Sequence, residues 1–409
     1  MDNVFDFRNR LINEYSSFSR SFSKVSAQDI LSKVELEYDR GRYWPEPLIQ
    51  INPNYKRQST VQQLAHEGML HASCSHIFQT GKTEGKAADL HLYVHQLQAL
   101  AKAQKQQSYV VTTGTGSGKS LAFFVPIIDR ILKAQQADPQ KRTRAIVIYP
   151  MNALANSQLE ELDKFLHGYP DEQKPFTVAR YTGQESDADR KQIADNPPDI
   201  LLTNFMMLEL ILTRFEDVDR RVVEHCQGLE FLVLDELHTY RGRQGADVAL
   251  LVRRLRERLQ AHQLVCIGTS ATMSSTGTQA DRNQTVASVA SLLFGAQITE
   301  HDVIGETLER VTNPFKDIQA VKPLLKSVLL KESHHWPDFA AFSDDPLAVW
   351  VELSLGIELP LDEPPRRAKP ITLGDAAKRL ADDAQCTLEE ASAGLQRFLV
   401  AAHDVKTPQ

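Results

Sequence analysis

The chain of 409 residues is 42% hydrophobic and carries a formal net charge of −7. Its length allows two or three domains with buried cores, and no apolar run approaches the ~20 residues of a membrane span. The net charge argues against a general nucleic-acid coat protein, although a groove needs only local positive charge to bind DNA or RNA.

The first residues, MDNVFDFRNRLINEY, carry charges throughout and lack the apolar core of a secretory signal. Four cysteines stand far apart and form no C-x-x-C pair: Cys74, Cys226, Cys266 and Cys386. We therefore expect a reduced chain in the cytoplasm, without disulfides and without a membrane partner.

Residues 1–89 are predicted to form a helical N-terminal accessory region. Apolar residues recur at helical spacing over 4–23, and a second helix is expected at 26–37 with Ser26 as its N-cap. A further helix is expected at 91–105, directly upstream of the glycine-rich segment described next.

A glycine-rich turn lies between the apolar run Tyr109–Val111 and a stretch from Leu121 onwards with apolar residues at helical spacing. Strand, glycine-rich loop and helix in this order are the context of a P-loop, whose backbone N–H groups and helix N-terminus face a polyphosphate. Lys119 supplies a positive charge for the β- and γ-phosphates, and Ser120 supplies a hydroxyl for Mg²⁺. The predicted ATP-binding residues of this loop are Thr113, Gly114, Thr115, Gly116, Ser117, Gly118, Lys119 and Ser120.

Continuous apolar runs follow the P-loop, each bounded by polar or turn residues, at 145–150, 176–182, 199–204, 229–236 and 263–272. Helical patterns separate them. Strands of this kind between helices indicate a parallel sheet covered on both faces. The predicted fold class is therefore α/β, with a RecA-like P-loop NTPase domain over 90–275, a helical N-terminal region and a mainly helical C-terminal region.

The apolar strand that ends in LVLDELH places Asp235 and Glu236 at the carboxyl edge of the predicted sheet, where α/β domains bind ligands. Asp235 would hold Mg²⁺ through water, and Glu236 would orient and deprotonate the water that attacks the γ-phosphate. The predicted catalytic residues are thus Glu236, Asp235 and Lys119, and the predicted Mg²⁺ ligands are Ser120 and Asp235.

Six segments occur in the order of the first lobe of a helicase: GTGSGKS, YPMNALANSQ, YTGQE, ILLTN, DELH and TSAT. Over residues 90–275 the chain resembles a superfamily 2 DEAD/DEAH-box helicase. It is most similar to the YprA-like bacterial DNA helicases, which have relatives in phage-defence systems such as DISARM and Druantia. Thr113 stands where the strict P-loop pattern has glycine, and this superfamily relaxes that position in the same way.

The resemblance implies three further groups of site residues. Tyr93 and Gln96 lie where relatives recognise adenine, and a glutamine amide can bond to N6 and N7 of that base; the alternative is a solvated helix position. Coupling between the nucleotide and the Asp-Glu segment would come from His238, Ser270, Ala271 and Thr272. Contacts to the nucleic-acid backbone would come from Pro150, Met151, Asn152, Ala153, Thr182, Gly183, Thr203 and Asn204.

The resemblance also implies a second RecA-like lobe whose arginine completes the ATP site, but nothing like its QxxGRxGR motif occurs in 276–409. We therefore expect the front part of a longer protein, which binds nucleotide but hydrolyses it poorly, since such an arginine is worth about 10³–10⁵ in rate. Residues 276–358 are predicted as a linker with the start of a second lobe or an insertion. Residues 359–409 are predicted as a helical hairpin or part of a winged helix, with Thr372 and Thr387 as N-caps.

The sequence thus predicts an ATP-dependent helicase or translocase that uses ATP and Mg²⁺ and acts on single-stranded DNA or on duplex DNA with a single-stranded end, with RNA as an open alternative. Its partners would be the second lobe and, in a defence setting, other defence subunits. The alternative function is a nucleotide-gated nucleic-acid clamp or assembly factor that does not unwind. A P-loop kinase is disfavoured because TSAT has no place in it.

Overall fold

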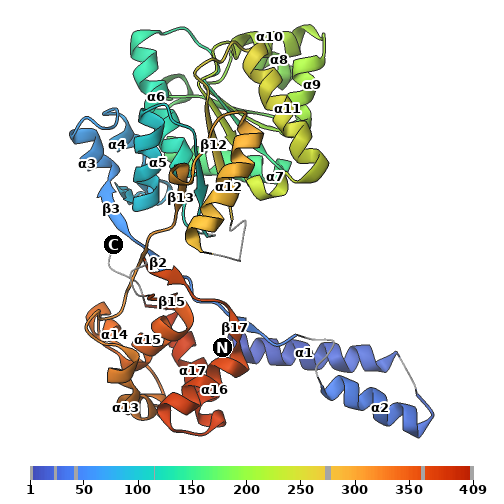
Figure 1. The fold of residues 1–409 in the computed structure, drawn as a ribbon, viewed down its shortest axis with the longest axis vertical. Coiled ribbons are helices and arrows are strands. Elements are labelled where there is room, and N and C mark those ends of the chain that lie inside the picture. Colours follow the sequence, from blue (N-terminus) through green and yellow to red (C-terminus); the bar gives the residue numbers. More distant parts are fainter. Residues whose placement is uncertain are drawn as a thin grey trace. The chain divides into compact units, whose positions relative to one another are not determined.

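A computed structural model describes residues 3–22, 25–40, 45–114, 116–271, 278–360 and 364–405. Two predicted site residues, Thr115 and Thr272, lie outside the described residues. Contacts group the chain into two compact units (Figure 1). Tyr55–Thr307 forms the sheet unit, and residues 1–54 together with 308–409 form the helical unit.

The sheet unit is organised around a parallel sheet. Its described strands are β7 (Tyr109–Thr112), β8 (Ala145–Tyr149), β9 (Val178–Tyr181), β10 (Ile200–Asn204), β11 (Phe231–Leu234), β12 (Val265–Ser270) and β13 (Val303–Gly305). They lie in the order β13-β7-β12-β11-β8-β10-β9, and each neighbouring pair is parallel. The predicted α/β class is confirmed.

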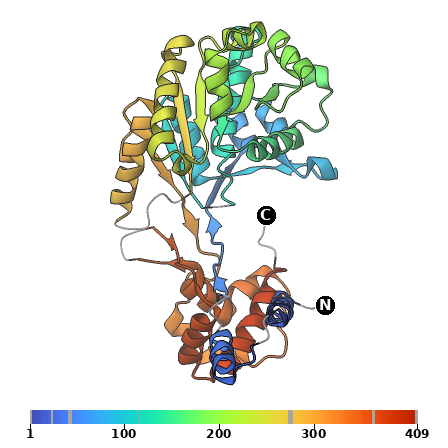
Figure 2. The same cartoon turned by 90° about the vertical axis from the view of Figure 1, so that its right-hand side faces the viewer.

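Helices cover both faces of this sheet (Figure 2). Successive strand residues point to opposite faces, so Tyr109 and Val111 of β7 join one core while Val110 joins the other. The helices of the first core include α5 (Val94–Gln104), α6 (Leu121–Ala137) and α7 (Asn152–Leu166). Those of the second are α8 (Asp187–Asp195), α9 (Phe205–Thr213), α10 (Asp217–His225), α11 (Gly242–Arg258) and α12 (Gln279–Phe294). Burial on both faces explains why the strands read as continuous apolar runs.

The sheet unit begins well before the predicted boundary at residue 90. Its first elements are β3 (Arg57–Thr60), α3 (Val61–His66), α4 (Cys74–Ile77), β4 (Gln79–Thr80), β5 (Ala88–Asp89) and β6 (His91–Tyr93). The helix predicted over 91–105 is wrong at its first three residues, because His91–Tyr93 pair with β3 as an antiparallel strand. The α5 helix begins only at Val94.

The sheet unit also extends past the predicted boundary at residue 276. Thr278 caps α12 in a capping box with Asp281, and Val303 and Ile304 of β13 are buried against β7. The predicted division into regions 1–89, 90–275, 276–358 and 359–409 stays a prediction. In the structure α12 and β13 pack with the sheet unit. The physical reason is that β13 covers the otherwise open edge of β7.

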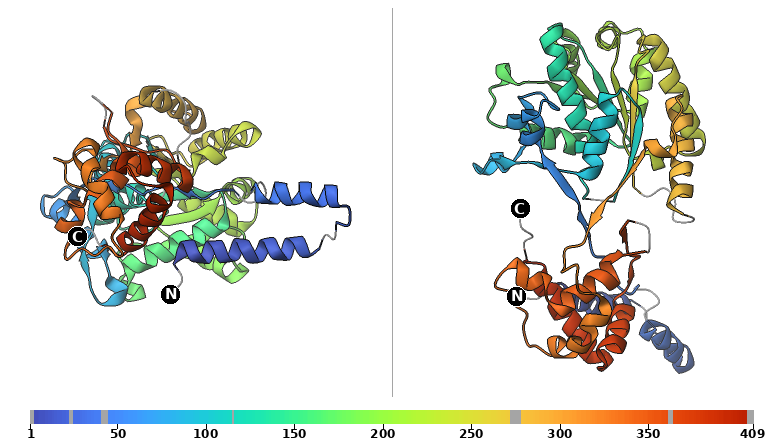
Figure 3. Two further views of the ribbon diagram at one scale, coloured as in Figure 1. Left: turned by 90° about the horizontal axis from the view of Figure 1, so that it is seen from below. Right: turned by 60° about the vertical axis from the view of Figure 1, so that its left-hand side comes forward.

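The helical unit contains α1 (Val4–Ser21) and α2 (Gln28–Asp39), which lie side by side (Figure 3). The guanidinium of Arg20 lies over the Tyr38 ring at 4.6 Å. Ser26 is not the N-cap that the sequence predicts, because α2 begins at Gln28 after Ala27. Within the part of the chain that the structure describes, every helix is too short or too polar to cross a membrane.

The rest of the helical unit packs around the buried Trp350. Its elements include β1 (Leu48–Ile49), α13 (Ile318–Leu329), α14 (Phe339–Ser343), α15 (Pro346–Val351), β15 (Ile357–Glu358), β16 (Arg366–Arg367), β17 (Ile371–Thr372), α16 (Leu373–Ala384) and α17 (Leu388–Ala402). The predicted N-caps are confirmed: Thr372 accepts from the Asp375 N–H, and Thr387 forms a capping box with Glu390. The short strands pair antiparallel as β1 with β17 and β15 with β16.

Gly268 of β12 is a position where only a hydrogen side chain fits. A methyl group there would overlap Leu237 Cδ1 and lie 3.1 Å from Phe294 Cζ. We expect Gly268→Ala to lower the free energy of unfolding by about 1–3 kcal/mol, because overpacking displaces well-packed neighbours. Chemical denaturation followed by circular dichroism measures this loss.

Gly305→Ala in β13 is the matched control. A methyl group there would meet only Gln279 Nε2, at 4.0 Å, so its effect should stay within about 0.5 kcal/mol. Equal losses in the two variants would contradict the packing argument.

Candidate functional site

The predicted motifs collect at the carboxyl edge of the sheet and divide into two groups there. The P-loop follows β7, Asp235 and Glu236 follow β11, and Ser270 ends β12, which lies between those two strands. The segments predicted to contact nucleic acid follow β8, β10 and β9, which are adjacent on the other side. Crevices at this edge of open parallel sheets bind ligands.

The P-loop turns through two glycines in the left-handed region, Gly116 at φ +77° and Gly118 at φ +66°. The Thr113 and Ser117 hydroxyls bond to each other at 2.6 Å, and both residues are buried. Lys119 Nζ donates to the Thr113 carbonyl at 3.2 Å. Thr113, which stands where the strict P-loop pattern has glycine, thus forms a hydrogen bond across the loop with a hydroxyl that glycine would lack.

Gln96 lies against the P-loop and is only 2% exposed. Its Oε1 accepts from the Tyr93 N–H at 2.8 Å, and its Nε2 donates to the Gly118 carbonyl at 2.9 Å. Both halves of the amide thus bond to this chain's own backbone. Adenine recognition by Gln96 and Tyr93 stays a prediction.

Thr269 joins the two carboxylates to β12. Its hydroxyl donates to Asp235 Oδ1 and accepts from the Glu236 N–H. Glu236 adopts φ +53°, a left-handed conformation that is uncommon for a residue with a side chain. This turn directs the chain away from β11 immediately after Asp235. Thr269 lies in the TSAT segment but is not among the predicted coupling residues, which begin at the next residue, Ser270.

Ser270 contacts a different residue of the same segment. Its hydroxyl lies 3.3 Å from His238 Nδ1, which in turn lies 3.2 Å from Glu236 Oε2. Glu236 Oε2 is buried and makes no hydrogen bond among the described residues. The two hydroxyls of β12 thus contact the Asp-Glu segment at separate points, while Ala271 follows the strand as part of the turn. The coupling roles of His238, Ser270 and Ala271 stay predictions.

Asp235 is largely enclosed. Burial raises its pKa, the Thr269 hydroxyl opposes this, and the charge of Glu236 raises the pKa further while the charge of Lys119 lowers it. Tyr149 is buried nearby, and burial together with the Asp235 charge raises the pKa of its phenol. A cation would offset the cost of two neighbouring carboxylates, and the Ser120 hydroxyl makes no capping bond to α6. The donor set therefore fits Mg²⁺.

A second cluster of contacts joins the end of β10 to the residues that follow β8 and β9. Asn204 Nδ2 donates to Asn152 Oδ1 at 2.7 Å and to the Thr182 carbonyl at 3.0 Å. Thr203 is fully buried, and its hydroxyl donates to the Tyr181 carbonyl at 2.6 Å. The structure thus brings the predicted nucleic-acid residues together, but it directs the Thr203 hydroxyl into the fold.

Other members of that predicted set face solvent. Met151 is 60% exposed, Ala153 and Gly183 are also exposed, and Pro150 is half-buried. Their contact with nucleic acid stays a prediction.

Glu185 caps the loop after β9. Its Oε2 accepts from the Thr182 and Gly183 N–H groups at 2.7 and 2.9 Å, and its Oε1 accepts from Arg180 Nε at 2.8 Å. The two backbone donors predicted to hold a nucleic-acid phosphate therefore bind a carboxylate of this chain. Glu185 was quoted in YTGQE without being selected, because nothing local shows where its side chain points.

With this geometry in hand, comparison with known proteins gives a family. Residues 93–280 match the family model described as DEAD/DEAH box helicase. This segment is a DEAD/DEAH box helicase domain. Over 186 residues the chain is 34% identical to the "uncharacterized ATP-dependent helicase YprA" of Bacillus subtilis, covering 45% of this chain and 23% of that protein.

Two further similar proteins have a lower sequence identity to this chain than YprA. The chain is 26% identical over 293 residues to the Druantia protein DruE of Escherichia coli, covering 45% of this chain and 16% of DruE. A crystal structure of the DUF1998 helicase MrfA bound to DNA aligns with a TM-score of 0.48 and 23% identity, over 71% of this chain and 37% of that one. The chain thus spans less than a quarter of the length of either curated relative.

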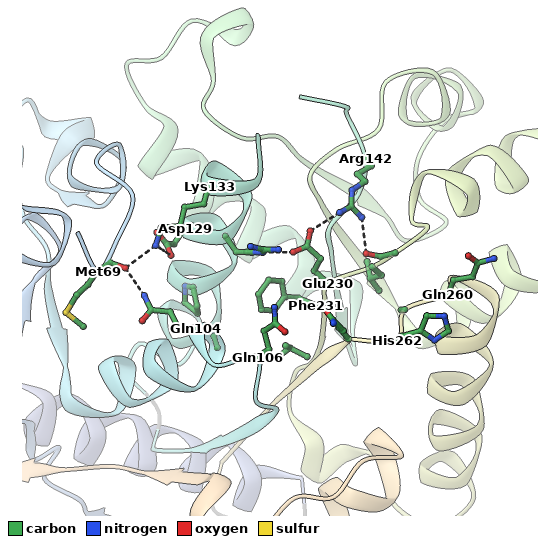
Figure 4. A pocket seen from close by; sticks show the side chains of 18 of the residues that line it. Met69, Gln104, Gln106, Asp129, Lys133, Arg142, Glu230, Phe231, Gln260 and His262 are labelled. Atoms are coloured by element: carbon green, nitrogen blue, oxygen red, sulfur yellow. Dashed lines mark hydrogen bonds and ion pairs between the residues drawn. The ribbon is translucent and has the colours of Figure 1, made fainter. Parts of the chain in front are cut away.

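The sheet unit also has a cavity of about 780 Å³, at the amino edge of the parallel sheet (Figure 4). Glu230 lies in its wall and pairs with Arg130 at 2.6 Å and Arg142 at 3.0 Å. Asp129 pairs there with Lys133 at 2.8 Å. Each of these carboxylates thus has a cationic partner, and no predicted site residue that the structure describes lines the cavity.

Glu185 makes a pH-dependent contribution to the stability of the helicase domain. Burial raises its pKa, but hydrogen bonds from the Thr182 backbone and hydroxyl and from Arg180 outweigh burial and hold the pKa below its ordinary value of 4.5. A depressed folded-state pKa contributes stability above the unfolded value and loses it as pH falls through the folded one. We expect Glu185→Gln to lower the free energy of unfolding by about 1–3 kcal/mol at pH 7, and by less as the pH falls below 4.5.

Urea denaturation at a series of pH values measures this difference. Glu172→Gln is the control, because Glu172 is exposed and should leave stability unchanged. A gap between wild type and Glu185→Gln that stays constant with pH would rule out the capping role.

Proposed function

We propose that this chain carries the ATP-binding lobe of a larger ATP-dependent DNA helicase or translocase that acts in the cytoplasm. The observation that carries the proposal is the convergence of three motifs on adjacent strands, with Thr269 bonded to both residues of the Asp-Glu pair. The helicase family match supports the same reading. Neighbouring loops after β8, β9 and β10 offer a separate surface for a nucleic-acid backbone.

In this proposal ATP lies with its phosphates on the P-loop, from Thr113 to Ser120. Mg²⁺ held by Ser120 and, through water, by Asp235 would neutralise charge on the β- and γ-phosphates. Lys119 adds a fixed positive charge to the same phosphates. Glu236 orients a water for attack and accepts its proton, and the buried Oε2 with no hydrogen bond among the described residues supports that role.

We further propose that a second RecA-like lobe, in the rest of a longer chain, completes the ATP site. Support comes from the relatives, which extend far beyond the part that this chain covers. The DruE likeness makes phage defence, with other defence subunits as partners, a proposal for the biological setting. DNA is the proposed substrate, and RNA is the other substrate to be tested.

ATP hydrolysis with and without single-stranded DNA or RNA tests the proposal. Measurements are made on this chain and on the longest natural protein that contains it. We expect nucleic acid to stimulate hydrolysis in the longer protein, and DNA to do so more than RNA. Glu236→Gln should lower the rate by about 10²–10⁴-fold, the usual contribution of a general base. Lys119→Ala should weaken ATP binding as well as hydrolysis.

Lys105→Ala and Glu257→Gln are matched controls that remove the same charges from exposed positions, and neither should change the rate. Hydrolysis that survives both site substitutions would refute the motor proposal. Tight ATP and DNA binding without hydrolysis in either protein would favour the nucleotide-gated clamp instead.

A further inference from the structure

A carboxylate of this chain lies on the P-loop. The Gly114 N–H donates to Glu306 Oε2 at 3.0 Å. P-loops use backbone N–H groups of this kind to hold nucleotide phosphates. Glu306 lies within residues 276–358, the region predicted as a linker with the start of a second lobe or an insertion, and it is not among the predicted site residues.

The parallel sheet fixes where Glu306 lies. β13 pairs with β7 in a register that sets Gly305 opposite Thr112, so the residues that follow both strands emerge side by side. Thr112 Oγ1 also donates to the Ile304 carbonyl at 3.3 Å. Just before β13, Asp302 pairs with Lys102 of α5 at 2.7 Å. The contacts of Asp302 and Ile304 thus fix β13 against α5 and β7, and they position Glu306 beside Gly114.

The carboxylate also acts on a neighbour that supports the loop. His95 is fully buried, and its Nε2 lies 2.9 Å from the Ser117 carbonyl. Burial lowers the pKa of His95, and the contact with the Ser117 carbonyl and the negative charge of Glu306 oppose this only in part. Glu306 thus contacts Gly114 directly, and its charge acts on the histidine that contacts Ser117.

We propose that Glu306 is an internal occupant of the phosphate-binding loop, which a bound nucleotide must displace, and that it thereby sets the affinity for polyphosphate. This inference rests on the proposed function. A carboxylate and a phosphate are both anions, so they compete for the same N–H donor and repel each other at short range. Glu306 weakens the binding of every ligand that carries a polyphosphate and leaves the binding of a nucleoside unchanged.

Displacement of Glu306 acts on the segment where the chain leaves the sheet unit. The next residue, Thr307, accepts a hydrogen bond at its carbonyl from the Lys56 N–H at 2.9 Å. Lys56 follows the first residue of the sheet unit, and Thr307 is its last residue. A nucleotide that moves Glu306 therefore acts beside this hydrogen bond.

Isothermal titration of ATP, inorganic pyrophosphate and adenosine into wild type and Glu306→Gln tests the proposal. We expect Glu306→Gln to bind ATP and pyrophosphate about 3- to 10-fold more tightly, with adenosine unchanged. The gain should shrink as salt is raised, because the effect is electrostatic. Glu309→Gln removes the same charge from an exposed position three residues later and should change none of the affinities.

Glu306→Ala provides a second variant, and thermal unfolding without ligand checks that each variant is folded. Unchanged or weaker pyrophosphate binding in both folded variants, with wild type binding normally, overturns the role of Glu306 and leaves the proposed function intact. Failure of wild type and variants alike to bind ATP or pyrophosphate overturns both. Binding by the variants alone supports the inference in its strongest form.

Discussion

The position of β12 between β7 and β11 is the constraint on which the site depends. Parallel pairing brings the ends of the three strands to one edge, and it sets Thr269 across from Val111 on one side while Gly268 pairs with Leu234 on the other. From that position the Thr269 hydroxyl reaches Asp235 and the Glu236 N–H. The absence of a side chain at Gly268 leaves room for Leu237, the residue after Glu236. The contact between Gly268 and Leu237 therefore helps to position Asp235 and Glu236 beside the Thr269 hydroxyl.

A second theme is that the chain supplies its own anions to backbone donors. Backbone N–H groups without a partner are costly when they are buried, so turns that direct several N–H groups inwards need an acceptor. Glu306 serves Gly114 in the P-loop, and Glu185 serves Thr182 and Gly183 in the loop after β9. The two cases differ in their setting. Glu185 also pairs with Arg180 and caps its own loop, whereas Glu306 follows β13 and lies 192 residues from Gly114 along the chain.

Local sequence was a good guide wherever the signal is periodic or fixed by a few neighbouring residues. The strands after the P-loop, the capping residues Thr372 and Thr387 and the position of Asp235 after β11 all follow from such patterns. The N-cap at Ser26 and the start of the helix at His91 were wrong. At His91 the antiparallel pairing with β3 outweighed a helical pattern, since strand pairing depends on a partner distant in sequence.

The sequence by itself determined the α/β class, the order of the motifs along the strands and the similarity of residues 93–280 to DEAD/DEAH box helicases, because each follows from contiguous residues. Only the tertiary structure decided which side chains those motifs bond to. It showed that the Gln96 amide bonds to the backbone at Tyr93 and Gly118, that Thr269 rather than Ser270 joins Asp235, and that Glu306 lies on Gly114. These contacts join residues as much as about 190 positions apart. The register of a parallel sheet brings them together, and no local pattern encodes that register.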